Sequence, residues 1–133
     1  MILGIGIDIV DISEFALQLQ DTASVFVEET FTLGEHHAAH ARPAHKPAQH
    51  YAVRWAAKEA FVKAWTAAYF GQAPQLLHMD YRNMEIVQDD FGRPALRLHG
   101  DVARVFGASK RCHLSLSHDG NFASAVVIIE EIP

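Results

Sequence analysis

The segment from Tyr51 to Phe70 constrains the fold more than any other part of the chain. It reads YAVRWAAKEAFVKAWTAAYF and is rich in alanine and long side chains, without Gly or Pro. Such a composition predicts a long helix. Pro47 suits its first turn, because a backbone N–H there would have no helical partner. We therefore expect one long helix to organise the rest of the chain.

This helix has faces of different character when residues are placed at 100° intervals. The stripe predicted to face the core contains Val53, Ala57, Ala60, Phe61, Ala64 and Ala68. Glu59 and Lys63 fall on the opposite side, which they share with Trp55, Val62 and Phe70. Arg54, Lys58 and Trp65 lie on the flank between. A carboxylate and an amine framed by aromatic residues suggest a partly covered site or a subunit contact, although Glu–Lys pairs four residues apart also support exposed helices.

The opening segment Ile2 to Val10 alternates as a strand does. Leu3, Ile5, Ile7 and Ile9 share one face, and Gly4, Gly6 and Asp8 share the other. Glycine weakens a strand unless something approaches its backbone closely. Two interpretations stay open: a neighbour or ligand comes close to this face, or it is a packed edge at which Asp8 begins a turn.

Three early helices are predicted before the long one, the third of them opening at Thr32 and ending before Pro43. Ser13 is placed to cap a helix through Phe15, Leu17 and Leu19, and a short helical segment follows at 25–30. Thr32 and Glu35 have the spacing of a capping box, in which each side chain accepts from a free backbone N–H.

The second half of the chain predicts two hairpins with a short helix between them. The expected strands are Met84–Gln88, Ala95–His99, His113–Ser117 and Phe122–Glu130, with a helix at Asp101–Ser109. The last strand is apolar on both sides and should be central. The chain is thus predicted to be a single α+β domain over residues 1–133, with a long central helix packed on a mainly antiparallel sheet.

Histidines gather before the long helix, at His36, His37, His40, His45 and His50. His36 and His40 lie one turn apart and could bind a transition metal, which leaves a histidine-rich metal-binding protein as an alternative function. No nearby Cys or closed ligand set supports a zinc site. A polar helix and loop is the favoured interpretation.

Composition excludes several classes of function. The net charge of −5 gives no sign of a nucleic-acid surface. No apolar run is long enough to cross a bilayer, and the opening segment lacks a basic leader. The lone cysteine, Cys112, cannot form an internal disulfide, so we expect a cytoplasmic protein.

Three stretches taken together resemble the holo-[acyl-carrier-protein] synthase type of 4′-phosphopantetheinyl transferase. They are GIGIDIV at 4–10, RWAAKEAFVKA at 54–64 and LSLSH at 114–118, with GRP at 92–94 as a lesser feature. The resemblance implies transfer of phosphopantetheine from coenzyme A to a serine of an apo acyl carrier protein, in fatty acid biosynthesis. Adenosine 3′,5′-bisphosphate leaves, and Mg²⁺ is required.

The same resemblance implies roles for individual residues. Asp8 and Glu59 would hold Mg²⁺, which prefers one or two carboxylates plus substrate phosphates and water. Glu59, directly or through water, would take the serine proton, and Lys63 would protonate or stabilise the departing phosphate.

Further residues would contact coenzyme A. Arg54, Lys58 and Lys63 are the candidate phosphate contacts, and Ser117 is either a coenzyme A contact or a plain strand residue. His118 would lie near the nucleotide or the incoming serine, with Asp119 orienting it. The resemblance also implies a homotrimer with active sites between subunits. A non-catalytic coenzyme A or carrier-binding module on the same scaffold is the alternative.

The chain departs from the family pattern in two places. Many members are glycine-rich after the central helix, where this chain reads TAAYFGQAP at 66–74. Members that dock acidic carriers tend to have a basic early helix, whereas residues 13–30 contain no Lys or Arg and four acids, Glu14, Asp21, Glu28 and Glu29. Docking must therefore use Phe15 and Phe26, use Arg42 and Lys46, or involve a less acidic carrier, such as a domain of a large synthase.

Overall fold

The computed structural model describes residues 1–41 and 46–133, so Arg42 and His45 lie outside the described residues. The elements follow in the order β1 (Ile2–Asp11), α1 (Ile12–Gln20), α2 (Phe26–Thr30), α3 (Leu33–His40), α4 (Pro47–Ala67), the 3-10 helix η1 (Tyr81–Asn83), β2 (Met84–Gln88), β3 (Pro94–Leu98), α5 (Gly100–Phe106), β4 (Lys110–Asp119) and β5 (Phe122–Glu131). This order confirms the α+β class.

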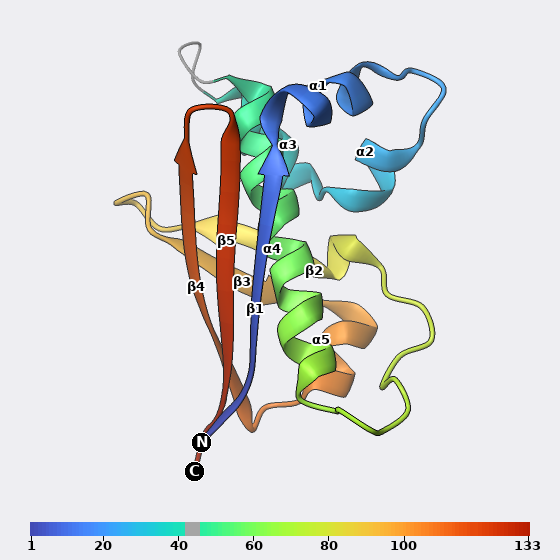
Figure 1. Ribbon diagram of the computed structural model, residues 1–133, viewed down its shortest axis with the longest axis vertical. Helices are drawn as coiled ribbons and strands as arrows, with labels where there is room; N and C mark the ends of the chain where they lie inside the picture. Colours follow the sequence, from blue (N-terminus) through green and yellow to red (C-terminus); the bar gives the residue numbers. More distant parts are fainter. Residues whose placement is uncertain (42–45) are drawn as a thin grey trace.

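Every strand pairing in the described residues is antiparallel. One sheet has three strands in the order β1-β5-β4, and a second sheet pairs β2 with β3. β5 is central, as its apolar sequence predicts. Figure 1 shows α4 running along the three-stranded sheet, with α1 to α3 gathered at one end of the helix and both chain termini at the other end of the sheet.

Two glycines explain how closely α4 approaches β1. A Cβ on Gly4 would overlap the carbonyl oxygen of Ala64, and a Cβ on Gly6 would overlap that of Ala60. Of the two sequence interpretations, close approach is therefore correct, and the neighbour is the backbone of α4. Small residues on both elements let the helix lie against the strand.

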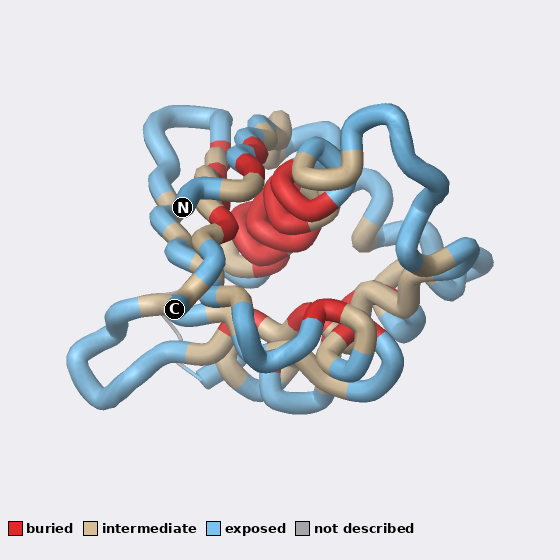
Figure 2. Tube along the Cα trace, turned by 90° about the horizontal axis from the view of Figure 1, so that it is seen from below, coloured by how far each residue is buried: buried red, intermediate tan, exposed pale blue. Residues whose placement is uncertain are grey.

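The long helix is the most buried element of the chain, as the red tube in Figure 2 shows. Pro47 occupies its first turn as predicted, but α4 ends at Ala67. Phe70 is therefore outside the helix and 95% exposed, so it does not share a face with Glu59.

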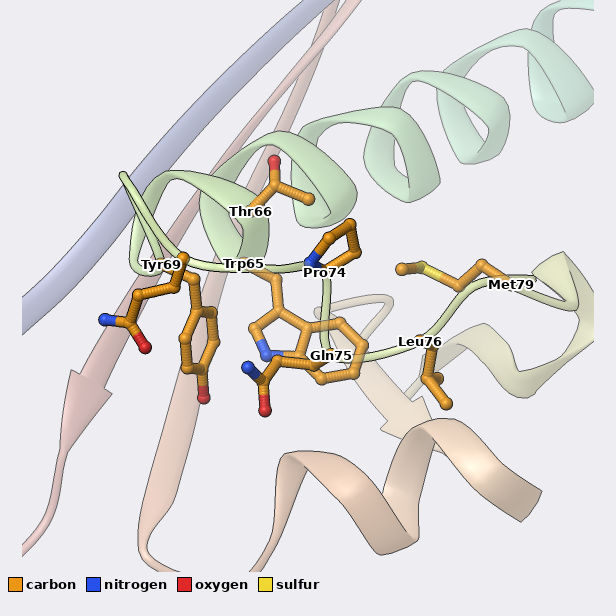
Figure 3. A pocket seen from close by; sticks show the side chains of 8 residues that line it. Trp65, Thr66, Tyr69, Pro74, Gln75, Leu76 and Met79 are labelled. Carbon is orange, nitrogen blue, oxygen red and sulfur yellow. The ribbon is translucent and has the colours of Figure 1, made fainter.

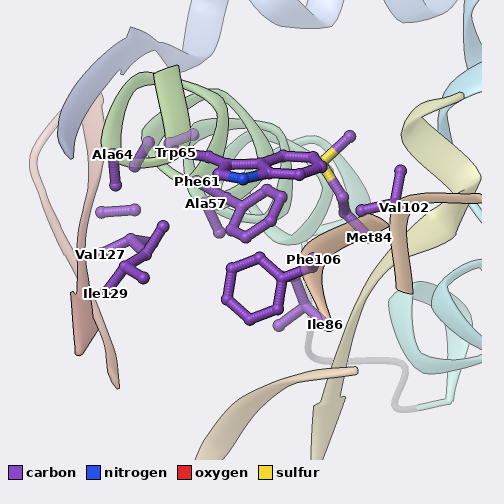
Figure 4. Close-up of a cluster of buried hydrophobic side chains, with 13 residues drawn as sticks. Ala57, Phe61, Ala64, Trp65, Met84, Ile86, Val102, Phe106, Val127 and Ile129 are labelled. Atoms are coloured by element: carbon purple, nitrogen blue, oxygen red, sulfur yellow. The ribbon is translucent and has the colours of Figure 1, made fainter. Parts of the chain in front are cut away.

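Trp65 belongs to the core although the sequence placed it on a flank. Its side chain is 2% exposed, and its ring packs against Phe61 and Phe106, with centroids 5.6 Å and 5.7 Å away. Figure 4 shows these rings between α4 and α5, beside β5 side chains such as Val127. Trp65 is buried because Phe106 of α5 covers this end of the flank.

Helix capping differs from the prediction at α1 and agrees at α3. Asp11 caps α1 by accepting from the backbone N–H of Glu14, while the Ser13 hydroxyl donates to Asn121 in the β4–β5 turn. Thr32 and Glu35 form the predicted capping box. Among the described residues, no helix is both long and apolar enough to cross a bilayer.

Candidate functional site

The first candidate site is a hollow of about 310 Å³ between β1, α1 and α4. We call it the acidic hollow; it is lined by Asp8, Ile9, Val10, Asp11, Glu14, Phe15, Gln18, Trp55 and Glu59. Asp8 reaches it from β1 and Glu59 from the middle of α4. The close packing of Gly6 on α4 thus brings the two carboxylates predicted to bind metal to one hollow.

Lys63 lies beside Asp8 at this hollow. Its ammonium group donates to Oδ1 of Asp8 and to the carbonyl oxygen of Ile7, both at 3.0 Å. The Lys63 side chain remains 54% exposed, whereas that of Asp8 is 16% exposed. The cation therefore sits at the rim of the hollow, open to solvent.

Tyr81 is a site residue that the sequence did not reveal. Burial, together with a hydrogen bond to the Glu59 carboxylate and the charge of that carboxylate, raises the pKa of its phenol to about 12. The Tyr81 ring also packs on Trp55, with centroids 5.2 Å apart. The phenol thus stays protonated at neutral pH and donates to Glu59.

A second, larger hollow of about 680 Å³ lies between the start of α4, the β2–β3 hairpin and β4. We call it the basic hollow; its lining includes Lys46, Gln49, His50, Arg54, Gly92, Pro94, Ser117 and His118. The structure thus brings Arg54, Ser117 and His118 together. Asp119 is exposed at the end of β4 and does not line either hollow.

Arg54 is an unusual member of this lining because it is only 2% exposed. One guanidinium nitrogen donates to the carbonyl oxygen of His50 at 3.2 Å, while Nε has no hydrogen-bond partner among the described residues. Burial lowers the pKa of Arg54, with Glu35 opposing the shift. A buried cation with a free donor is a natural partner for an anion.

Lys58 does not lie in either hollow. Its side chain is 0% exposed, and Nζ donates to Glu35 at 2.7 Å, to the Thr30 carbonyl at 2.7 Å and to the Tyr81 carbonyl at 2.9 Å. These three bonds use all the donors of an ammonium group. We therefore correct the assignment of Lys58 from phosphate contact to structural residue.

The histidines of α3 make contacts within the protein. His36 shares a hydrogen bond of 2.7 Å with the Tyr51 hydroxyl, and His40 one of 2.9 Å with the carbonyl oxygen of His36. Burial lowers the pKa of His36. In residues 1–41 and 46–133 there is no group of three or more side chains arranged to hold a metal.

The acidic hollow has the ligand chemistry of a hard cation. Asp8 and Glu59 offer carboxylate oxygens without sulfur or imidazole nearby. Mg²⁺ commonly takes only one or two carboxylates and completes its shell with phosphates and water. The donor set therefore fits Mg²⁺ and does not fit a closed zinc site.

Comparison with known proteins identifies the family of the chain. Residues 4–127 match the family model of the 4′-phosphopantetheinyl transferase superfamily. The holo-[acyl-carrier-protein] synthase of Nocardia farcinica is 47% identical over 130 residues, covering 98% of this chain and 88% of the relative. That of Mycolicibacterium paratuberculosis is 46% identical over 129 residues, covering 97% of each.

Solved structures give the same result. An ACPS–CoA complex from Chronobacterium ammoniagenes has a TM-score of 0.89 at 38% identity, covering 97% of each chain. Mycobacterium tuberculosis acyl carrier protein synthase has a TM-score of 0.80 at 42% identity, covering 98% of this chain and 99% of the other. The chain therefore belongs to the 4′-phosphopantetheinyl transferase superfamily and is an enzyme of the holo-[acyl-carrier-protein] synthase type.

Proposed function

We propose that residues 1–133 form one transferase domain that moves the 4′-phosphopantetheine group of coenzyme A to a serine of an acyl carrier protein, with Mg²⁺ held by Asp8 and Glu59. The observation that carries this proposal is the meeting of the two carboxylates at the acidic hollow, with Lys63 on Asp8. The relatives named for this activity, and the coenzyme A complex of one of them, support it.

The residues of the acidic hollow divide the chemistry between them. Bound Mg²⁺ would neutralise charge that develops on the pyrophosphate. Glu59 accepts the proton of the carrier serine, directly or through water, and Tyr81 holds its carboxylate in place. Lys63 is exposed enough to leave Asp8 for the departing phosphate, which it stabilises or protonates.

The basic hollow takes the nucleotide end of coenzyme A. Arg54 offers its unpaired Nε, and Lys46 adds a second cation. His118 and Ser117, both on β4, also line this hollow. Asp119 follows His118 at the strand end, and its role in orienting His118 stays a prediction of the family resemblance. Cations in a walled hollow suit the phosphates of a nucleotide, since the low dielectric strengthens each charged hydrogen bond.

The active site is built between subunits of a homotrimer. Within the described residues, the acidic and basic hollows share no lining residue. Arg54 and Glu59 are five positions apart on α4, about 140° around the helix. One coenzyme A would thus span the acidic hollow of one protomer and the basic hollow of the next.

An apolar sheet face supports this assembly. Ile5, Ile7 and Ile9 are 63%, 63% and 67% exposed on the side of β1 that faces away from α4. In register they lie beside Ile128, Val126 and Ser124 of β5. A contiguous apolar patch of this kind marks a protein interface. Sedimentation of the protein should give a trimer, and Ile7→Glu should release monomers that have lost transfer activity.

We place the protein in the cytoplasm. Cys112 is a free thiol, which suits a reducing cytoplasm. Coenzyme A and carrier proteins are the partners we expect there, as part of lipid metabolism.

Intact-mass analysis tests the activity directly. The protein is incubated with coenzyme A, an apo carrier and Mg²⁺, and the carrier should gain the mass of one phosphopantetheine. Omitting Mg²⁺, or replacing Glu59→Gln or Asp8→Asn, should stop the gain. A non-catalytic coenzyme A or carrier-binding module would bind both partners and leave the carrier mass unchanged, which would overturn the proposal.

A further inference from the structure

The turn between β4 and β5 is held against the start of α1 by Asn121. Its amide oxygen accepts from the Ser13 hydroxyl at 2.6 Å and from the Ser13 backbone N–H at 3.2 Å, while its amide nitrogen donates to Oδ1 of Asp11 at 2.7 Å. The carbonyl oxygen of Asn121 accepts from the backbone N–H of Ile12 at 2.8 Å. Figure 1 shows this turn and the start of α1 at the same end of the sheet. One residue of the turn thus makes several hydrogen bonds to the first turn of the helix.

These bonds require a donor and an acceptor on one short side chain. Ser13 presents two donors, and Asp11 presents a carboxylate that can only accept. An amide supplies both groups, whereas a carboxylate at position 121 would stand against the carboxylate of Asp11. The same oxygen of Asp11 caps α1 by accepting from the backbone N–H of Glu14 at 3.1 Å. Asn121 therefore also holds the capping residue in place.

The helix that Asn121 holds forms one wall of the acidic hollow. Glu14, Phe15 and Gln18 of α1 line this hollow, which also contains Glu59. A helix of nine residues is not stable by itself, so its position depends on its contacts with the rest of the protein. Phe15 is buried in the core and fixes the middle of α1. The bonds of Asn121 fix its beginning.

The helix α1 lines neither of the two other hollows in the part of the chain that the structure describes. The basic hollow is bounded by α4, β4 and the β2–β3 hairpin. A further cavity of about 110 Å³ lies beside the last turn of α4, and Figure 3 shows Trp65, Tyr69 and Met79 around it. A shift of α1 would therefore change the acidic hollow and leave the proposed nucleotide site as it is.

We propose that Asn121 is a positioning residue for the transfer reaction: it fixes the first turn of α1 and so sets the wall past which the carrier serine reaches Glu59. This inference rests on the proposed function, since it takes the carrier to approach Glu59 at the acidic hollow. The turn keeps its place without the Asn121 side chain, because Asp119 and Phe122 pair on either side of it. Loss of the side chain should therefore release α1 rather than the hairpin.

The kinetics of Asn121→Ala separate positioning from folding. The value of kcat/KM for an apo carrier should fall by about 10- to 10²-fold, because a misplacement of about 1 Å far from the reacting atoms can cost that much. The fall should include a higher KM for the carrier, whereas KM for coenzyme A and its calorimetric Kd with Mg²⁺ should stay at the wild-type values. Partial unfolding would lower kcat alone and leave both KM values unchanged, which would overturn the inference.

Two other results also have a clear meaning. An equal rise in KM for coenzyme A would overturn the inference, since the hairpin rather than α1 would then have moved. A wild-type protein that transfers nothing to any carrier would instead overturn the proposed function.

Exchanging the two side chains tests the bond between them. Asn121→Asp should raise KM for the carrier as Asn121→Ala does, because it brings two like charges together. Adding Asp11→Asn restores one amide and one carboxylate and returns the net charge to that of the wild type. The double variant should therefore recover most of the lost kcat/KM, and both single variants complete the cycle. A double variant no better than Asn121→Asp would contradict the inference.

Ser13→Ala and Asp101→Ala complete the set. Ser13→Ala removes only the hydroxyl bond to Asn121, so it should raise KM for the carrier by a smaller factor, which keeps the test decisive if Asn121→Ala does not fold. Asp101→Ala is the control, because it removes an exposed bond to Arg104 on α5 and lines none of the three hollows. It should leave both KM values unchanged. An effect on the carrier as large as that of Asn121→Ala would show that the loss of any surface bond is enough, against the inference.

Discussion

The ammonium nitrogen of Lys63 lies 3.0 Å from Oδ1 of Asp8, which joins the C-terminal half of α4 to β1 at the rim of the acidic hollow. Lys63→Met should reduce transfer by about 10²–10³-fold, the usual loss when one group that stabilises developing charge is removed. Its effect on the free energy of unfolding should stay below about 1 kcal/mol, because exposed ion pairs contribute little. Mass-detected kinetics and urea unfolding measure the two effects. Loss of activity through unfolding would contradict a chemical role for Lys63.

Tyr81 should titrate far above an ordinary tyrosine because its pKa is about 12. The folded pKa is raised, so the stabilising contribution is fully present below about pH 10, where the unfolded phenol titrates, and is lost as pH rises towards 12. The difference between the absorbance titration curves of the native protein and of the Tyr81→Phe variant isolates this phenol. Glu59→Gln removes the carboxylate and should bring the midpoint closer to 10. A midpoint that Glu59→Gln leaves in place would mean that Tyr81 does not contact Glu59.

Gly6→Ala should destabilise the protein by about 1–3 kcal/mol, in the range of other overpacking substitutions. The new Cβ would meet the Ala60 carbonyl, a helix backbone atom that cannot turn away. Gly34→Ala is the comparison variant, because its Cβ would meet the carboxylate of the Glu85 side chain rather than backbone. Urea unfolding of both variants gives the comparison. A loss at Gly34 as large as that at Gly6 would show that helix–strand contact is not the cause.

The features that the sequence predicted correctly are those with a local signal. Composition and Pro47 are enough to predict α4, and alternation with glycine predicts both β1 and the close approach to it. Lys58 and Trp65 could not be placed in this way. Their burial depends on Glu35 and Phe106, which come from distant parts of the chain.

In the candidate site too, residues within local motifs could be predicted, whereas residues placed by distant contacts could not. Asp8, Glu59 and Lys63 belong to recognisable motifs, and the structure brings them together. Tyr81 lies in a short 3-10 helix after an irregular segment, where neither periodicity nor a motif marks it. Ser13 is a good capping residue by type, but Asp11 occupies the capping position because β1 runs on to that residue.

Lys58 and Glu35 form a fully buried ion pair of 2.7 Å between α4 and α3. Burial lowers the pKa of Lys58, and Glu35 opposes that shift. Lys58→Met should cost about 3–5 kcal/mol, since it leaves the Glu35 carboxylate buried without its cation.

The double variant Lys58→Met/Glu35→Gln should recover a large part of this loss, because neither residue then carries a buried charge. Urea unfolding of the wild type, both single variants and the double variant completes the cycle. Additive losses would show that the two charges do not depend on each other.

The acidic surface of α1 and α2 should govern the choice of carrier. Glu14 lines the acidic hollow, and Asp21, Glu28 and Glu29 are exposed on the adjoining segment. A carrier that delivers its serine to Glu59 must pass this surface, so like charges slow an acidic carrier and salt relieves the repulsion. We expect kcat/KM for an acidic carrier to rise with ionic strength, and to fall for a carrier with a basic docking helix.

Reversing the charge on α1 should reverse that salt dependence. Glu14→Lys/Asp21→Lys should increase kcat/KM for the acidic carrier by about tenfold or more at low salt, in the range of electrostatic steering, and the advantage should shrink as salt is added. Glu131→Lys, compared with Glu14→Lys alone so that each variant changes the net charge by the same amount, is the control, because this exposed acid ends β5 beside the chain termini, at the opposite end of the sheet from α1. If both variants respond to salt in the same way, net charge rather than docking at α1 sets the rate, and the carrier must approach from another side.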